Sequence, residues 1–431
     1  MLDRIFRLSE NQTTVRRELL AGLTTFMTMA YIVVVNPLIL SGAGMPVEGV
    51  LFATCISAAL ATLVMGLWAN YPIALAPGMS LNAYFTYSIV IGRGIPWQTA
   101  LGVVFLSGVV FLLLTLTKAR EQIVNGIPDS LKHGTAAGIG LFIAFIGLRN
   151  AGIIVASPAT LVSLGKLSEP QVLLAAFGVV LIAILMARRI DSAILIGIVA
   201  ITLIGIPLGI SHWPQHLVSW PQPSGTLFKL DLRAAIKLGL AELVFIFFFV
   251  DLFDNVGTLV AVCEEGGFMR DGKLPRASRA LLADAFGTIA GALAGTSTVT
   301  SYIESAAGVA AGARTGLGNL LIAALFVAAM FCSPLVAAIP AYATSPALIL
   351  VGALMCGAIA RVKWNELTDA VPAFLTLIVT PLTFSIATGL SLGLLSFTSI
   401  KLFAGRRREI SPLIWVLTVL FLLRYAFLGA E

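Results

Sequence analysis

Three carboxylic acids lie in stretches of sequence that are otherwise apolar. Asp251 and Asp254 belong to AELVFIFFFVDLFDNVGTLVAV, and Glu304 follows the hydroxyl-rich run in GTSTVTSYIES. Because Asp251 and Asp254 are three residues apart, a helix places them on neighbouring positions of one face. A buried acid without a cationic neighbour favours its protonated form, because its charge loses solvation. Such acids can take up and release protons and can accept hydrogen bonds from a ligand N–H.

A third polar segment, YPIALAPGMSLNAYFTYSIV, carries Asn82, Ala83 and Phe85. An amide offers donors and an acceptor, which is the pattern needed to recognise the edge of a heterocycle. Phe85 and Tyr302 could stack on a flat base. The alternatives are that Asn82 only satisfies an interrupted backbone and that the aromatic rings only pack.

These residues form the predicted site. We expect substrate binding by Asn82, Ala83, Phe85, Asp254, Tyr302 and Glu304, and proton coupling by Asp251, Asp254 and Glu304. A structural role for Asp251, bonded to a neighbouring helix, remains open. The four cysteines have no metal-type spacing and are expected to be core residues, so no metal or other cofactor is predicted.

The composition shows what must position these residues. The 431 residues are 58% hydrophobic and only 11% charged, with a mean hydropathy of +0.99. A soluble protein of this size could not hide so much apolar surface, so we expect a polytopic all-α membrane protein. At about 20 residues per span, about fourteen spans consume most of the chain, and the first of them is predicted at 18–40. The net charge of +6 is ascribed to loops rather than to nucleic-acid binding.

Basic residues are distributed unequally between the loops that join these spans, which predicts the orientation. A cytoplasmic N-terminus puts most of them inside: Lys118, Arg120, Lys132, Arg188, Arg189, Arg270, Lys273, Arg276, Arg279, Arg314, Arg361, Lys363, Lys401, Arg406, Arg407 and Arg408. The outer loops receive Arg93, Arg149, Lys166, Lys229, Arg233 and Lys237. This asymmetry follows the positive-inside rule. We therefore predict a multi-pass protein of the cell membrane with its N-terminus in the cytoplasm.

Two spans carry residues that interrupt helices. The third, at 72–92, contains Pro72, Pro77 and Gly78, and the tenth, at 296–313, contains a Ser/Thr run and Gly308. They occupy matching places in two sets of seven spans, and an odd number of spans inverts the second set. Paired broken helices in inverted repeats indicate a binding site near the middle of the membrane. We predict repeats at 1–210 and 239–404, followed by an extra apolar segment at 412–428.

Four motifs, in order, resemble the AzgA-like purine permeases of the nucleobase–cation symporter family. They are VNPLIL (35–40), ALAPGMSLNAYF (74–85), VDLFDNVGTL (250–259) and TSYIESAAGVAAGARTGL (300–317). The resemblance implies a core domain, 18–117 plus 239–338, and a gate domain, 129–210 plus 344–404. It also implies a homodimer formed through gate helices, and movement of the core against the gate.

The resemblance also implies roles for single residues. The family's substrate and proton acids fall on Asp254 and Glu304, its polar span-three residue falls on Asn82, and Asp251 matches a further family acid. Uracil-type relatives carry a histidine beside the span-eight acid, where this chain has Asn255, so no histidine role is carried over. APGMSLNAYF resembles members that carry adenine, or adenine with hypoxanthine and guanine, more than it resembles the guanine–hypoxanthine group.

The expected function is proton symport of a purine base into the cell, with adenine first and hypoxanthine or guanine next. One alternative is an inorganic-anion carrier of the same architecture, which would need positive charge between the broken spans. A second is an intramembrane enzyme that holds Mg²⁺ on Asp251 and Asp254. A third is a passive channel. We favour the carrier over an enzyme because the pair lacks a second, facing acidic cluster.

Overall fold

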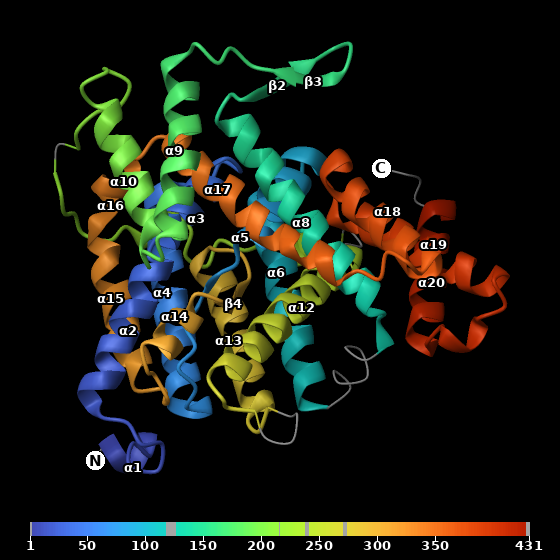
Figure 1. Cartoon of the computed structure of the whole chain (residues 1–431), viewed down its shortest axis with the longest axis horizontal. Helices are drawn as coiled ribbons and strands as arrows, with labels where there is room; N and C mark the ends of the chain where they lie inside the picture. Colours follow the sequence, from blue (N-terminus) through green and yellow to red (C-terminus); the bar gives the residue numbers. More distant parts are fainter. Residues whose placement is uncertain (1, 118–125, 215, 238–240, 270–273, 428–431) are drawn as a thin grey trace. The chain divides into compact units, whose positions relative to one another are not determined.

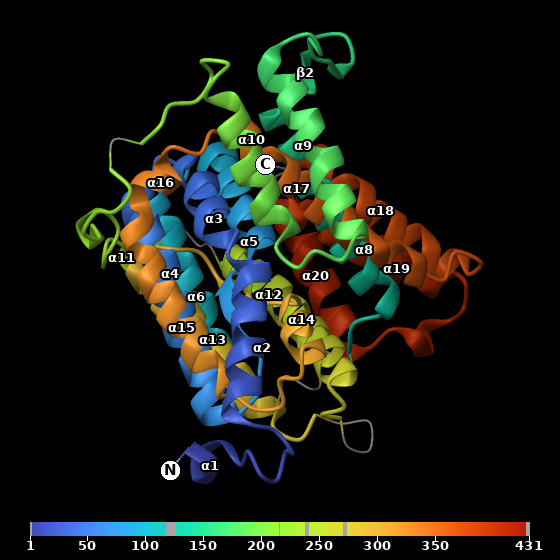
Figure 2. The same ribbon diagram turned by 60° about the vertical axis from the view of Figure 1, so that its left-hand side comes forward.

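The computed structural model describes residues 2–117, 126–214, 216–237, 241–269 and 274–427, and most of these residues are helical. The predicted cytoplasmic residues Lys118, Arg120, Arg270 and Lys273, the predicted repeat start at 239 and the end of the segment 412–428 lie outside these ranges. Figures 1 and 2 show the chain from two directions.

Long apolar helices dominate the described part of the chain. Nine candidate spans there are long and apolar enough to cross a membrane: Val15–Ser41, Val47–Ala69, Trp97–Leu116, Asp129–Asn150, Pro170–Ala187, Ala241–Glu265, Gly318–Ala337, Ala341–Arg361 and Ile386–Phe403. Shorter apolar helices cover Ala193–Gly205, Leu367–Thr383 and Pro412–Leu423. The protein is thus a helical, multi-pass membrane protein.

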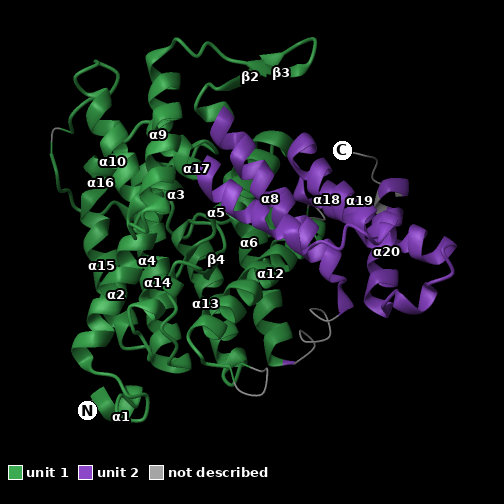
Figure 3. Cartoon of the chain, viewed as in Figure 1, with its two compact units in different colours: residues 1–116, 149–347 green, residues 117–148, 348–431 purple. Residues whose placement is uncertain are grey.

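Contacts divide the chain into two compact units, which Figure 3 colours separately. Unit 1 comprises residues 1–116 and 149–347, and unit 2 comprises residues 117–148 and 348–431. Unit 1 contains the helices α1 (Leu2–Phe6), α2 (Val15–Met29), α3 (Ile32–Ser41), α4 (Val47–Val64), α5 (Met79–Ala83), α6 (Trp97–Leu116), α9 (Pro170–Ala187), α10 (Ala193–Gly205), α11 (Leu232–Lys237), α12 (Ala241–Glu265), α13 (Ala277–Ala294), α14 (Ser305–Ala310), α15 (Gly318–Ala329) and α16 (Ser333–Ala337).

Unit 2 holds most of α8 (Asp129–Asn150) together with α18 (Leu367–Thr383), α19 (Ile386–Phe403) and α20 (Pro412–Phe427). The boundary between the units falls inside α17 (Ala341–Met355). Ser385 begins α19 as an N-cap, because its hydroxyl accepts a hydrogen bond from the backbone N–H of Thr388.

An ion-pair network fastens the turn between α19 and α20. The Lys401 ammonium, almost fully buried, lies 3.0 Å from Asp369 and 2.8 Å from Glu409. Arg406 pairs with both Glu409 and Glu366. The hydrogen bonds from Arg406 and Lys401 lower the pKa of Glu409 to about 2. At the middle of the two helices the hydroxyls of Thr398 and Thr418 bond at 2.7 Å.

Small residues let the helices of unit 1 approach closely. A Cβ added to Gly22 of α2 would lie 2.6 Å from the carbonyl oxygen of Gly318 in α15, so this crossing excludes any larger side chain. Close backbone approach through small residues is the usual basis of helix association in membranes. Within unit 1, α13 packs against α4 and α6, and α15 packs against α2 and α4.

The predicted breaks in the third and tenth spans are confirmed. The third consists of the strand β1 (Leu75–Pro77), α5 and the π-helical segment η2 (Tyr84–Ile91). The tenth consists of the strand β4 (Val299–Ser301) and α14. β1 and β4 pair antiparallel, with Leu75 opposite Ser301 and Pro77 opposite Val299. Each span is therefore an extended segment followed by a short helix, and the two extended segments meet (Figure 1).

Candidate functional site

The paired strands are fixed by hydrogen bonds beyond their own ladder. The backbone N–H of Tyr302 donates to the Ala74 carbonyl at 3.0 Å, and the N–H of Gly78 donates to the Thr298 carbonyl at 2.9 Å. A Cβ on Gly78 would lie 2.9 Å from the Thr300 methyl, so glycine permits the start of α5 to lie against β4. The two interrupted spans thus form one rigid crossing inside unit 1.

Glu304 lies at the end of this crossing, as the residue that precedes α14. Its carboxylate accepts a hydrogen bond from the hydroxyl of Tyr31, which lies at the junction of α2 and α3. The Thr28 hydroxyl of α2 also reaches the backbone carbonyl of Glu304 at 3.4 Å. The first span therefore holds the acid of the tenth span in place.

Asp254 of α12 lies close enough to Glu304 for their charges to interact. Both side chains are partly buried. Among the described residues, no ion pair involves either acid. Two acids that share a site without a cation disfavour the state in which both are ionised. Asp254 and Glu304 thus influence each other's charge, and their roles in binding and coupling remain predictions.

Asp251 has a different environment from Asp254. It is 2% exposed, and the Thr288 hydroxyl of α13 lies 3.5 Å from its Oδ2. The same hydroxyl donates to the Val299 carbonyl at 3.0 Å and accepts from the Val299 N–H at 3.2 Å. Asp251 therefore lies against the link between α13 and β4, a position that suits support of the crossing.

Two buried amides lie on the elements that surround the crossing. Asn82 of α5 and Asn255 of α12 are both fully buried. In the described part of the chain, none of their side-chain nitrogen and oxygen atoms has a hydrogen-bond partner. Buried polar atoms are normally paired, and those that are not call for an explanation, such as a ligand or water. Asn82 thus has the free bonding capacity that recognition of a heterocycle requires.

The remaining predicted residues are buried, and one already has a partner. Tyr302 donates from its hydroxyl to the Pro77 carbonyl at 2.6 Å, which ties β4 to β1. Phe85 and Ala83 are almost fully enclosed. Next to Phe85, the ring of Tyr84 packs on Phe247 of α12 with ring centroids 5.5 Å apart. These residues contribute to the walls of the crossing.

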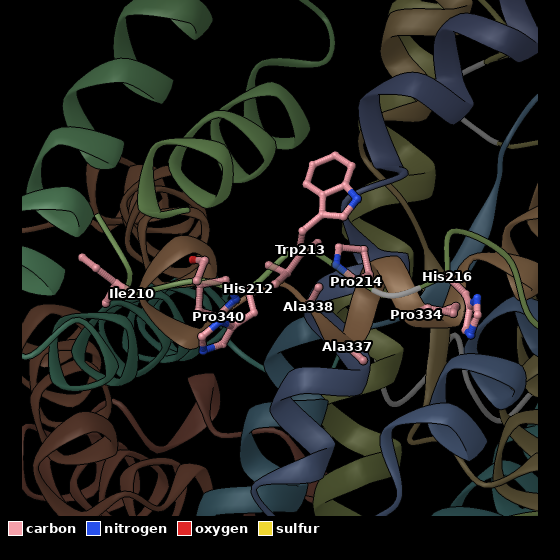
Figure 4. Close-up of a pocket in the computed structure, with 11 residues that line it drawn as sticks. Ile210, His212, Trp213, Pro214, His216, Pro334, Ala337, Ala338 and Pro340 are labelled. Atoms are coloured by element: carbon pink, nitrogen blue, oxygen red, sulfur yellow. The ribbon is translucent and has the colours of Figure 1, made fainter. Parts of the chain in front are cut away.

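A prominent surface pocket lies away from these acids. A cavity of about 470 Å³ is lined by residues 210–214, 216, 334 and 337–340, and Figure 4 shows Trp213, His212 and His216 among them. Its polar side chains are two histidines, the indole of Trp213 and Ser211, whose hydroxyl is already bonded to Tyr342 at 2.5 Å. This cavity contains none of the predicted site residues.

Sequence reasoning missed the partners of Glu304. Tyr31 and Thr28 lie in the first span, far along the chain from Glu304. The available signal was a tyrosine and a threonine in the middle of an apolar span, where a hydroxyl needs a partner. Asn255, the neighbour of Asp254, is as fully buried as Asn82 and has no predicted role from the sequence.

The sequence matches, over residues 16–392, a family described as "Permease family". It is 45% identical to the adenine permease AdeP of Escherichia coli strain K12, over 100% of this chain and 97% of AdeP. It is 47% identical to the guanine/hypoxanthine permease PbuO of Bacillus subtilis strain 168, over 97% of this chain and 99% of PbuO.

The fold also resembles a solved structure, the transmembrane domain of the cyanobacterium bicarbonate transporter BicA. The TM-score is 0.65, and the likeness covers 88% of this chain and 96% of that chain at 18% identity. At this identity the likeness concerns the fold alone.

Proposed function

The chain belongs to this permease family and is a transporter rather than an enzyme, and we propose that it carries a purine nucleobase into the cell together with protons. Transport of purine bases is the activity named for its relatives AdeP and PbuO. The observation that carries the proton-coupled part of the proposal is the pair of neighbouring acids, Asp254 and Glu304, without a cationic partner in the described chain.

The acids would couple the base to the proton. When the site faces the outside, a proton binds to the pair, because two close carboxylates in a poorly hydrated site disfavour double ionisation. The remaining carboxylate oxygen atoms accept hydrogen bonds from the N–H groups of the base. The loaded site then carries less net charge and can cross the membrane. Release of the base and the proton to the cytoplasm restores the charged pair.

The broken spans would provide the rest of the binding site. Backbone groups freed at interrupted helices can bond a polar ligand in the middle of a membrane. Asn82 adds an amide that has no protein partner among the described residues, while Phe85, Ala83 and Tyr302 shape the walls. Asp251 would support proton coupling indirectly, because it contacts Thr288 behind β4.

We assign the purine class from the relatives and adenine from the motif APGMSLNAYF, with hypoxanthine and guanine as the next candidates. The protein would lie in the cell membrane with its N-terminus in the cytoplasm, as the basic residues predict. It would need no cofactor other than the coupling proton. It would act as a homodimer formed through gate helices, while the core domain moves against the gate.

A competition panel tests the substrate assignment. Cells that lack their own purine permeases, transformed with this chain, should accumulate labelled adenine. Unlabelled adenine, hypoxanthine or guanine should suppress that uptake, whereas uracil and sulfate should not. Accumulation should collapse with a protonophore. Suppression by sulfate would instead favour the anion-carrier alternative, and uptake that only equilibrates would favour a channel.

A further inference from the structure

A β-hairpin that projects from unit 1 has one apolar face. β2 (Ile154–Ser157) and β3 (Leu161–Leu164) pair antiparallel, with Ile154 opposite Leu164 and Ala156 opposite Val162. Because side chains alternate across a strand, these four residues share one face of the hairpin. The other face holds Val155, Ser157, Leu161 and Ser163. One face is thus wholly apolar, whereas the other combines the two serines with Val155 and Leu161, which are 42% and 81% exposed.

The described part of the chain leaves much of this apolar face uncovered. Leu164 is 66% exposed and Val162 is 41% exposed. An isolated two-stranded hairpin is at best marginally stable in water, and this one is uncharged from residue 150 to residue 165. Its root is fixed, because Ala151 and Ile153 pack with Leu174 and Ala175 of α9 in a buried cluster. The exposed leucine and valine thus have a defined position relative to α9.

The surface that continues from the hairpin is that of a membrane span. Leu173, Phe177, Val180 and Ile184 of α9 are each about half exposed and follow one another at helical spacing along one face. In a multi-pass protein an exposed apolar stripe of this kind is suited to contact with lipid. In Figures 1 and 2 the hairpin lies beyond the first turn of α9, and in Figure 1 it runs across the direction of that helix. A segment that crosses the end of a span lies along the membrane surface.

We propose that the β2–β3 hairpin lies in the interface of the lipid bilayer, with its wholly apolar face, Ile154, Ala156, Val162 and Leu164, in the acyl region. The mixed face, which carries Ser157 and Ser163, would then lie toward the headgroups and water. Arg149 and Lys166 flank the uncharged segment at its two ends, where phospholipid headgroups can accept their charges. The hairpin would fix the depth of α9 in the membrane. This inference does not depend on which solute the protein carries.

Adjacent residues on opposite faces of one strand provide a matched test. Single cysteines replace Leu164 or Ser163 and carry a polarity-sensitive fluorophore, and the purified full chain is reconstituted in phosphatidylcholine vesicles. Labelling of the unmutated chain measures the background from its own cysteines. A doxyl group near the headgroup end of the acyl chain should quench the Leu164 probe at least about twofold more strongly than the Ser163 probe. Aqueous iodide should show the opposite order.

The pair Val162→Cys and Ser157→Cys repeats the comparison at a second position and guards against a local effect of one label. Equal quenching of the two faces by iodide, or equal quenching by the doxyl lipid, would overturn the proposal. So would protection of the Leu164 probe from both quenchers together with disulfide cross-linking of Leu164→Cys between copies, because a second copy of the chain would then cover this face.

Discussion

The hydroxyl of Tyr31 donates a hydrogen bond to the carboxylate of Glu304, across 273 residues of sequence. The contact joins the junction of α2 and α3 to the broken tenth span. It orients the acid and stabilises its charge, because a hydrogen bond to a carboxylate favours the ionised form. Tyr31 is therefore a positioning residue for the acid that we assign to substrate and proton.

Replacing Tyr31 with phenylalanine should change the pH dependence of transport. The loss of one hydrogen bond to a charged group removes about 1.5–3 kcal/mol of stabilisation from the carboxylate, so protonation becomes easier. We expect the pH of half-maximal purine uptake to move upward. Initial uptake rates between pH 5 and pH 9, in vesicles with matched protein content, measure the shift.

Tyr342→Phe is the matched control, because it removes a buried hydroxyl that bonds Ser211 away from the acids. The Tyr342→Phe variant should show the same pH dependence of purine uptake as the unchanged protein. Identical profiles for Tyr31→Phe and the unchanged protein would show that the Tyr31 hydroxyl has only a packing role.

Glu304→Gln should lower purine uptake by roughly 10- to 100-fold, because the amide does not titrate and presents N–H donors where an acceptor is needed. Uptake of labelled adenine, normalised to the amount of inserted protein, measures the loss. Normal uptake by a correctly inserted variant would refute the assignment of Glu304 to the site.

Asp254→Asn should separate accumulation from exchange. The variant retains a polar side chain for the base but loses a titratable group beside Glu304. We expect accumulation driven by a pH gradient to fail while exchange of internal for external base persists in part. An Asp254→Asn protein that still concentrates adenine under a pH gradient would remove Asp254 from the coupling step.

Asn82→Ala should alter which base is preferred. Its amide has no partner in the described part of the chain, so its loss removes contacts to ligand rather than contacts within the protein. We expect the inhibition constants of adenine and hypoxanthine to change by different factors, about 10-fold for a lost hydrogen bond. Asn11→Ala, which changes an exposed asparagine, is the control. The same inhibition profile in both variants would leave Asn82 a structural role.

The ion-pair network around Glu409 predicts a pH-dependent contribution to stability. Arg406 and Lys401 lower the pKa of Glu409 to about 2, against about 4.3 in an unfolded chain. A depressed pKa gives stability that is complete above the unfolded value and is lost as the pH falls through the folded value. In detergent at pH 7, the Tm of Glu409→Gln should therefore be a few degrees lower than the Tm of the unchanged protein. This difference in Tm should shrink between about pH 4 and pH 2. A difference that stays constant over this range would contradict the prediction.

Much of the architecture could be predicted because membrane spans leave simple patterns. The predicted spans correspond to the nine long spans in the described chain, the shorter helices α10 and α18, α13 and the two broken segments. Pro77, Gly78 and the Ser/Thr run located the breaks, since these residues weaken helices locally. The first predicted span, 18–40, proved to be two helices that meet at Ala30 and Tyr31. No proline or glycine marks that junction.

The candidate residues could be selected from the sequence, but their contacts could not. Asp254 and Glu304 stand out because acids are costly in an apolar span, and in the structure their charges interact. The bonds of Tyr31, Thr288 and Tyr302 join residues distant in sequence, and no local pattern encodes such pairs. The β2–β3 hairpin was missed because its residues, read alone, resemble a loop between two spans. The core and gate boundaries and the residue roles remain predictions.

The coupling of base and proton is tested most directly with a pH-sensitive dye trapped inside proteoliposomes that contain the purified protein. Adenine is added outside with no pH gradient imposed. We expect the interior to acidify as adenine enters, and we expect Glu304→Gln vesicles to show neither entry of adenine nor acidification. Entry of adenine into wild-type vesicles with no internal acidification would contradict proton symport.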